Sequence, residues 1–176
     1  MRGTIAITLA LLLTAATAQA DPIPPRRGRY HPRVKVARKV FKEVGRLKKK
    51  GKLELTEKKL KVCQPGQDTV RRMWVGPGGK ARLYQYEGGT DDRAIRATFY
   101  YDRAGRLVFA LAEATYHNSA SVVYRVYLNG KGKRVWQRRR VKGKPQGMYS
   151  STWPEAAMIH APRKALAAAD PCKGKK

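Results

Sequence analysis

Acidic residues, histidines, cysteines and long apolar runs are all scarce in this chain of 176 residues. The chain has 12 acidic side chains against 39 lysines and arginines, with three histidines and two cysteines. This leaves little material for a metal centre or for acid–base catalysis, so we expect no bound metal, no cofactor and no catalytic residue. The sequence also lacks a phosphate loop, a dinucleotide fingerprint, a nucleophile elbow and a metalloprotease helix.

The strongly apolar stretch of the chain covers residues 5–13. It is too short for a bilayer-spanning helix, which needs about 20 apolar residues, and we therefore expect no integral membrane span. Arg2 precedes this stretch and a small-x-small pattern ending at Ala20 follows it, which is the order of a secretory signal peptide. We interpret residues 1–20 as a signal peptide cleaved before Asp21, and the mature protein as periplasmic or extracellular.

The two cysteines, Cys63 and Cys172, both remain after this cleavage. In an exported protein an even number of cysteines indicates a disulfide before a metal site. The bridge would close a loop of just over 100 residues and stabilise the fold by at most about 4 to 5 kcal/mol. We therefore predict a Cys63–Cys172 disulfide that ties the C-terminal tail to the body of the protein.

Positive charge is unevenly distributed along the mature chain. Residues 21–62 carry 16 basic against 4 acidic side chains, and residues 131–144 carry 8 basic and none that are acidic. The middle, residues 63–130, has 9 basic and 6 acidic side chains. This pattern indicates a folded body with cationic surfaces that attract polyanions. The alternative is that the lysines and arginines only solvate the surface.

Four prolines occur in residues 21–32, which predicts an extended leader, and the pattern changes at Arg33. From there to Lys50, apolar residues recur every three or four positions, which predicts an amphipathic helix of about 17 residues. They are Val34, Ala37, Val40, Phe41, Val44 and Leu47. This apolar side either docks on the protein core or, as an alternative, inserts into a membrane surface.

From residue 69 to residue 142 the helical period disappears, and β-branched and aromatic residues cluster between glycine-rich turns. This pattern predicts an antiparallel sheet of five or six strands. The expected strands are 69–75, 80–87, 94–101, 106–116, 121–128 and 133–141.

Three of the turns share one form, with a glycine followed by a basic residue at spacings of 26 and 27 residues. Asp102 or Asn129 opens the turn with its side chain, and the glycine adopts the positive φ that reverses the chain. The middle copy, YDRAGRL, resembles the core of the YD repeats of large secreted shell proteins, and this resemblance implies only a β-hairpin. The three copies are residues 74–81, 100–107 and 127–134, with their glycines at 79, 105 and 132.

The expected fold is therefore α+β: an antiparallel β-meander packed against the N-terminal helix, with short C-terminal helices beginning near Pro154 and after Pro162. Residues 33–172 form a single domain, followed by a basic tail at 173–176. Alternation along the strands predicts one buried face beneath the N-terminal helix. Its expected members are Leu107, Phe109, Leu111, Val122, Tyr124, Val126 and Leu128.

The strand at 133–141 is the most informative candidate binding surface. Alternation places three arginines around Trp136 on one face, an arrangement that suits stacking combined with contacts to phosphate or carboxylate. Alternatively, Trp136 packs against Tyr124 or Tyr127, and the arginines protect an edge strand from further pairing. The candidate polyanion contacts are Arg134, Trp136, Arg138, Arg139, Arg140, Lys142 and Lys144, with Lys35, Arg38, Lys39, Lys42 and Arg46 on the helix.

The sequence thus favours an exported, non-catalytic binding or envelope-associated protein. Its expected partner is an anionic envelope polymer, an acidic glycan or extracellular nucleic acid. One alternative is a small secreted hydrolase of phosphodiesters or glycans, with His117 and His160 beside Lys142 or Lys144. Convergence of these groups in a cleft would favour that enzyme. The other alternative is a protein that lies on a membrane through its cationic helix.

Overall fold

The computed structural model describes residues 28, 30–61, 68–90, 92–144, 154 and 157–168. The predicted signal peptide, its cleavage site between Ala20 and Asp21, and both cysteines fall outside these residues and stay predictions. Across the described part of the chain, no helix is long and apolar enough to cross a membrane.

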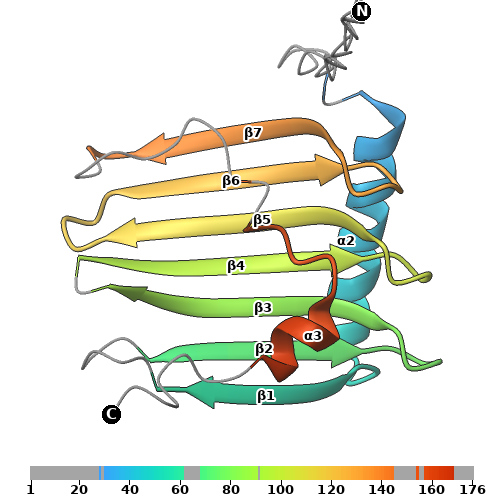
Figure 1. The fold of residues 1–176 in the computed structure, drawn as a ribbon. Coiled ribbons are helices and arrows are strands. Elements are labelled where there is room, and N and C mark those ends of the chain that lie inside the picture. Colours follow the sequence, from blue (N-terminus) through green and yellow to red (C-terminus); the bar gives the residue numbers. More distant parts are fainter. Residues whose placement is uncertain are drawn as a thin grey trace, which may run out of the picture.

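A seven-stranded antiparallel sheet forms the body of the fold (Figure 1). The strands lie in the sheet in their order along the chain, so each is hydrogen-bonded to its sequence neighbours. This confirms the predicted α+β meander, although with seven strands rather than five or six. The strands are β1 (Glu54–Leu60), β2 (Thr69–Val75), β3 (Ala81–Thr90), β4 (Arg93–Tyr101), β5 (Leu107–Tyr116), β6 (Ser121–Leu128) and β7 (Arg134–Lys142).

β1 is the strand that the sequence analysis missed. It pairs with β2 along its whole length at one edge of the sheet, and Leu60 is its one fully buried residue. Leu55 is 51% exposed, and the other positions are mostly charged. Charged residues on an edge strand discourage pairing with another chain. Because they occupy both faces of β1, the strand lacks the alternation of apolar and polar residues by which strands are predicted.

The hairpins β2–β3, β4–β5 and β6–β7 share one turn geometry, as predicted. Gly79, Gly105 and Gly132 have φ angles of 72°, 80° and 78°, and each amide donates to the carbonyl three residues earlier. Asp102 and Asn129 each accept two backbone hydrogen bonds through a side-chain oxygen. Each hairpin also carries a bulge on its second strand, where one extra residue opposes no partner. The extra residues are Arg82, Val108 and Val135.

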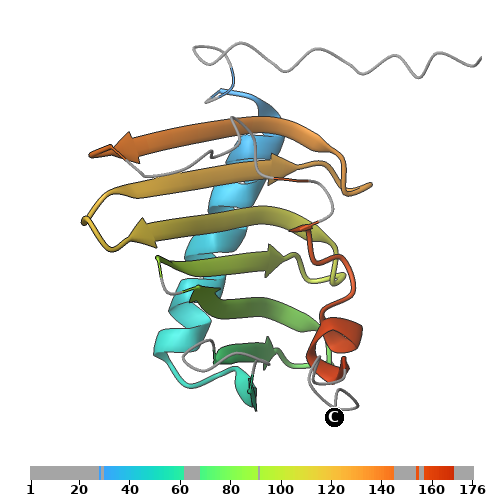
Figure 2. The ribbon, with the colours of Figure 1, turned by 60° about the vertical axis from the view of Figure 1, so that its left-hand side comes forward.

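Helix α2 (Pro32–Lys49) crosses one face of the sheet near the end where these three turns lie (Figures 1 and 2). Four of the six predicted apolar residues, Val34, Ala37, Val40 and Val44, are buried against the sheet and at most 7% exposed, whereas Phe41 is 42% exposed. Opposite them lie Trp74, Leu83, Val108, Phe109, Tyr127 and Trp136.

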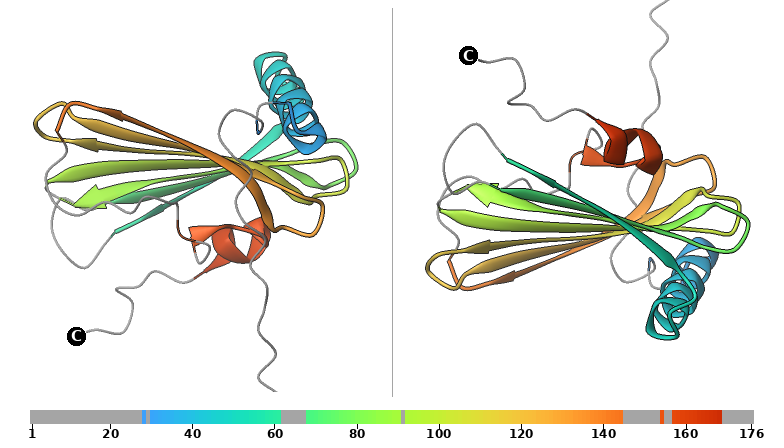
Figure 3. Two further views of the ribbon diagram at one scale, coloured as in Figure 1. Left: turned by 90° about the horizontal axis from the view of Figure 1, so that it is seen from above. Right: turned by 90° about the horizontal axis from the view of Figure 1, so that it is seen from below.

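The other face of the sheet carries a second core, and helix α3 (Pro162–Ala167) lies on that side (Figure 3). Arg71 fastens α3 to β2 on this side, because its guanidinium donates a 2.8 Å hydrogen bond to the Ala165 carbonyl. The helix expected from Pro154 falls mainly outside the described residues. This second core includes Tyr84, Phe99, Tyr101, Leu107, Val122, Tyr124, Val126, Leu128, Met158 and Leu166.

The prediction of one common buried face was wrong. Phe109 lies directly opposite Tyr127 and therefore faces α2. Leu107 and the predicted β6 set of Val122, Tyr124, Val126 and Leu128 lie in the second core, on the other side of the sheet. There are two reasons. The bulge at Val108 inserts one extra residue and so puts Leu107 and Phe109 on opposite sides. The register of β5 with β6 sets Phe109 opposite Tyr127 and thereby puts Val122, Tyr124 and Val126 on the side away from α2. Both faces are apolar near the turns, so alternation within one strand could not identify the face that α2 covers.

Candidate anion-binding surface

The edge strand β7 places its predicted arginines on both sides of the sheet. Arg138 lies opposite Arg125 and shares the α2 side with Trp136, as predicted. Arg134 was predicted on that side too, but it lies opposite Leu128 on the other side, because the extra residue Val135 reverses the alternation. Arg139 lies opposite Tyr124, also on the other side. Five of the predicted basic residues on or after β7 are exposed, and the sixth, Arg134, is half-buried. The exposed residues are Arg138, Arg139, Arg140, Lys142 and Lys144.

The basic residues predicted on α2 are all exposed. They occupy the side of the helix that does not contact the sheet, and the N-terminal end of α2 lies next to β7 (Figures 1 and 2). The fold therefore brings the two predicted basic segments together, although about 100 residues separate them in the sequence. The α2 members are Lys35, Arg38, Lys39, Lys42 and Arg46.

Trp136 does not offer an exposed stacking surface. It is 7% exposed and stacks on Tyr127, with ring centroids 5.0 Å apart and planes inclined by 29°. Gly28 lies against the indole so closely that a Cβ there would overlap the ring. The packing interpretation of Trp136 is therefore the one that the structure supports, and its ring is part of the core under α2.

Two predicted contacts, Arg38 and Arg138, converge on a groove of about 240 Å³ between α2 and strands β5 to β7. The same groove contains Arg125, which the sequence analysis did not identify because it lies in the charge-balanced middle segment. Pairing the strands outward from the turn would not have found this contact, because the extra residue Val135 shifts the register by one and so brings Arg138 opposite Arg125. The remaining lining is largely apolar: Ala37, Phe41, Phe109, Leu111, Tyr127 and Trp136.

Four carboxylates of the described residues, those of Glu43, Glu57, Glu87 and Asp102, form ion pairs with basic residues that do not line this groove. Glu43 accepts hydrogen bonds from Arg82 and Arg103 at 3.3 and 3.1 Å. Burial raises the pKa of the Glu43 carboxyl, but the hydrogen bonds from these two arginines outweigh that effect and hold the pKa below its usual range.

A second acid, Glu87, bridges Arg72 and Arg96 through contacts of 2.6 and 2.7 Å. The hydrogen bond from Arg72 is the main reason why the pKa of Glu87 is lowered. Within the described residues, no ion pair reaches Arg38, Arg125 or Arg138. The groove is consequently the place where guanidinium groups gather without compensating charge.

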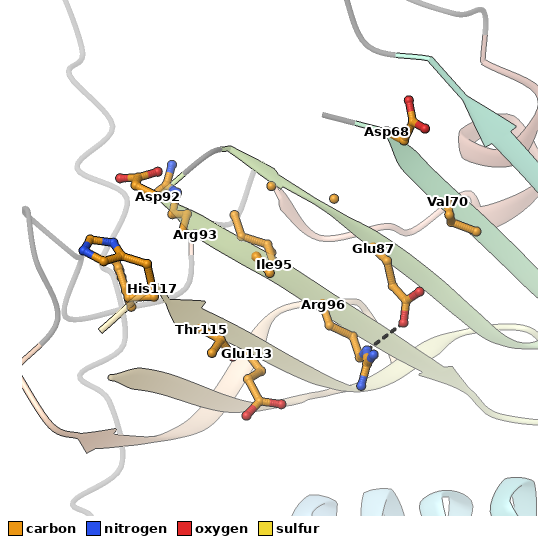
Figure 4. Close-up of a pocket in the computed structure, with 14 residues that line it drawn as sticks. Asp68, Val70, Glu87, Asp92, Arg93, Ile95, Arg96, Glu113, Thr115 and His117 are labelled. Atoms are coloured by element: carbon orange, nitrogen blue, oxygen red, sulfur yellow. Dashed lines mark hydrogen bonds and ion pairs between the residues drawn. The ribbon is translucent and has the colours of Figure 1, made fainter. Parts of the chain in front are cut away.

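A second, more open hollow of about 690 Å³ lies toward the opposite ends of the strands (Figure 4). It has mixed charge, with Glu87 paired to Arg96 across two strands and His117 at its rim. Asp68, Asp92 and Glu113 also line it, but among the described residues no three histidine, cysteine or acidic groups are arranged to hold a metal ion.

The histidines considered for a hydrolase do not meet. His117 follows β5 at one end of the sheet, and His160 packs against Gly132 in the turn at the other end. The length of β6 separates the two ends, roughly 25 Å at about 3.3 Å per residue. His31 caps α2 by accepting a hydrogen bond from the Arg33 amide. The arrangement gives no support to a site built from His117 and His160.

Comparison with known proteins yields no match: no protein-family model, no curated protein and no solved structure is significantly similar to this chain. The assignment of a function therefore depends on the geometry and charge described above.

Proposed function

We propose that this chain is an exported, non-catalytic protein that holds an anionic polymer of the cell envelope or its surroundings. The polymer lies along a basic surface made of the exposed side of α2 and of β7. Guanidinium and ammonium groups on this surface contact phosphate or carboxylate groups of the polymer.

The observation that carries this proposal is the accumulation of uncompensated charge where α2 meets β7. Several arginines elsewhere on the sheet are paired with acids, as Arg72 is with Glu57 and Glu87 and as Arg82 is with Glu43. Residues 131–144 contain no acid at all. A surface that concentrates one sign of charge raises the local concentration of a polymer of opposite sign.

Salt dependence tests this proposal directly. We expect both heparin and a single-stranded oligonucleotide to bind the mature protein. The difference between the two affinities identifies the polymer class. If about five to eight anionic groups are contacted, affinity for the oligonucleotide should fall by about a hundred- to a thousandfold between roughly 50 and 200 mM salt. Fluorescence anisotropy measures both affinities. The proposal would be refuted if neither polymer bound at the lower salt concentration.

Charge reversal locates the binding surface. Reversing Arg138 and Arg140 to glutamate should weaken polymer binding by at least about tenfold more than reversing Lys80 and Arg93, which are also exposed but lie off this surface. The two double variants have the same net charge, so equal losses would indicate diffuse attraction and no defined site. Arg71 and Arg72 are unsuitable controls, because Arg71 bonds to α3 and Arg72 to two glutamates.

Export has its own test. Material secreted by a host that processes signal peptides should begin at Asp21 and contain a Cys63–Cys172 bridge. Intact-mass measurement before and after reduction and alkylation checks both points. A retained N-terminus or two free thiols would contradict the exported part of the proposal.

A further inference from the structure

The groove between α2 and the sheet contains a pairing that antiparallel sheets normally avoid. Arg125 on β6 lies directly opposite Arg138 on β7, on the side that faces α2. Directly opposed Cβ atoms are about 4.5 to 5.5 Å apart, and like charges at this distance destabilise the pair. Arg38 adds a third guanidinium from the helix. An anion bound among the three would remove this repulsion.

The other two hairpins show that the fold does not require this pair. At the corresponding position of the first hairpin, Arg72 lies opposite Gln85 and is neutralised by two glutamates. In the second hairpin, Thr98 lies opposite Leu111. The opposed arginines are therefore a feature of the third hairpin, where the groove lies, and not of the repeated turn geometry.

An exposed aromatic side chain forms part of the same groove. Phe41 lies one helical turn after Arg38 on α2, and its side chain is 42% exposed. Its ring contacts the Phe109 ring, with centroids 5.8 Å apart. Phe109 in turn lies 4.9 Å from the Tyr127 ring. The aromatic rings thus continue from the core to the surface beside the arginines, and they leave apolar area in contact with water.

We infer that this groove binds an anionic amphiphile, with a phosphate or carboxylate group on Arg38, Arg125 and Arg138 and an apolar group against Phe41, Phe109 and Tyr127. This inference goes beyond the proposed function, because it assigns to the groove a ligand with an apolar part, which contact with a polyanion does not require. An anion without an apolar part leaves the aromatic wall in water, whereas a neutral apolar molecule leaves the guanidinium groups unpaired. The volume of about 240 Å³ admits a short alkyl or aryl group and not a complete lipid chain.

Isothermal titration calorimetry with octyl phosphate tests this inference. Inorganic phosphate and octyl glucoside supply the charged part and the apolar part separately, and the concentration of each alkyl compound is kept below that at which it forms micelles. We expect octyl phosphate to bind at least about tenfold more tightly than either compound. Equal affinity for octyl phosphate and inorganic phosphate, or for octyl phosphate and octyl glucoside, would overturn the inference.

Three variants locate the ligand. Arg138→Gln and Phe41→Ala should each weaken octyl phosphate binding by about tenfold, because they remove a charged contact and an apolar contact from exposed positions. The control Arg93→Gln removes the same charge from an exposed strand position that lies off the basic surface, and it should change affinity less than about twofold. Urea unfolding verifies that all three variants fold. Equal effects of Arg138→Gln and Arg93→Gln would refute the site.

The two proposals fail separately. If octyl phosphate binds and heparin and the oligonucleotide do not, the polymer function is wrong and the groove assignment holds. If the polymers bind and octyl phosphate does not, the basic surface is retained and the groove assignment is wrong. When octyl phosphate binds, a second experiment with vesicles that contain an anionic phospholipid distinguishes a membrane headgroup from a free amphiphile. Binding to vesicles that is lost in Phe41→Ala assigns the ligand to the membrane.

Discussion

The repulsion between Arg125 and Arg138 can be measured in the free protein. Both side chains are exposed, and their strands hold them directly opposite each other. Two unit charges about 6 Å apart in water repel by about 0.7 kcal/mol, and flexible side chains reduce this value by moving apart. We therefore expect a coupling of about 0.5 kcal/mol, within the range of about 0.2 to 1 kcal/mol found for cross-strand pairs.

A double-mutant cycle isolates this term. The free energy of urea unfolding is measured for the parent protein, Arg125→Gln, Arg138→Gln and the double variant in low salt. Either single change should relieve the repulsion, so the double variant should be less stable than the sum of the single effects predicts. In about 0.5 M salt, where the screening length falls to about 4 Å, the coupling should nearly vanish.

Arg139 supplies the control because it lies on the other side of the sheet from Arg125. A cycle of Arg125→Gln with Arg139→Gln should show no repulsive coupling at either salt concentration. If the Arg125–Arg138 coupling is zero or attractive in low salt, the guanidinium groups do not repel each other. An anion would then have no repulsion to remove, and the inferred site would lose its basis.

Two further predictions concern the folded body. Glu43→Gln should lower the free energy of unfolding by about 2 kcal/mol at neutral pH, because it removes the negative charge that neutralises the buried Arg82. The pKa of Glu43 in the folded state lies below its usual value of 4.5, so the stability that Glu43 contributes is present above pH 4.5 and is lost as the pH falls. The free energies of unfolding of the parent protein and Glu43→Gln should therefore converge in acid. A difference that stays constant with pH would contradict this expectation. Gly105→Ala should cost about 1 kcal/mol through its positive φ alone, and Gly132→Ala should cost more because its new Cβ would lie 2.8 Å from the His160 ring. Thermal unfolding compares the two variants, and equal losses would show that the His160 ring moves aside freely.

Much of the local structure follows from short-range patterns. The apolar spacing from Val34 to Leu47 predicted α2 to within a residue or two at each end. The six predicted strands and the three glycine turns also agree with the structure, because β-branched and aromatic runs and positive-φ glycines act within a few residues. β1 was missed because an exposed edge strand carries no alternating pattern.

The sequence by itself determined α2, strands β2 to β7, the repeated hairpins and the two basic segments, since each depends on neighbouring residues in the chain. Only the tertiary structure decided which residues meet. The bulge at Val108 separated Leu107 from Phe109, and burial under α2 removed the Trp136 ring from the surface. Pairing of β6 with β7 placed Arg125 opposite Arg138, and the packing of α2 added Arg38. Strand register and helix docking depend on contacts between distant residues, and a shift of one residue exchanges the two faces of a strand.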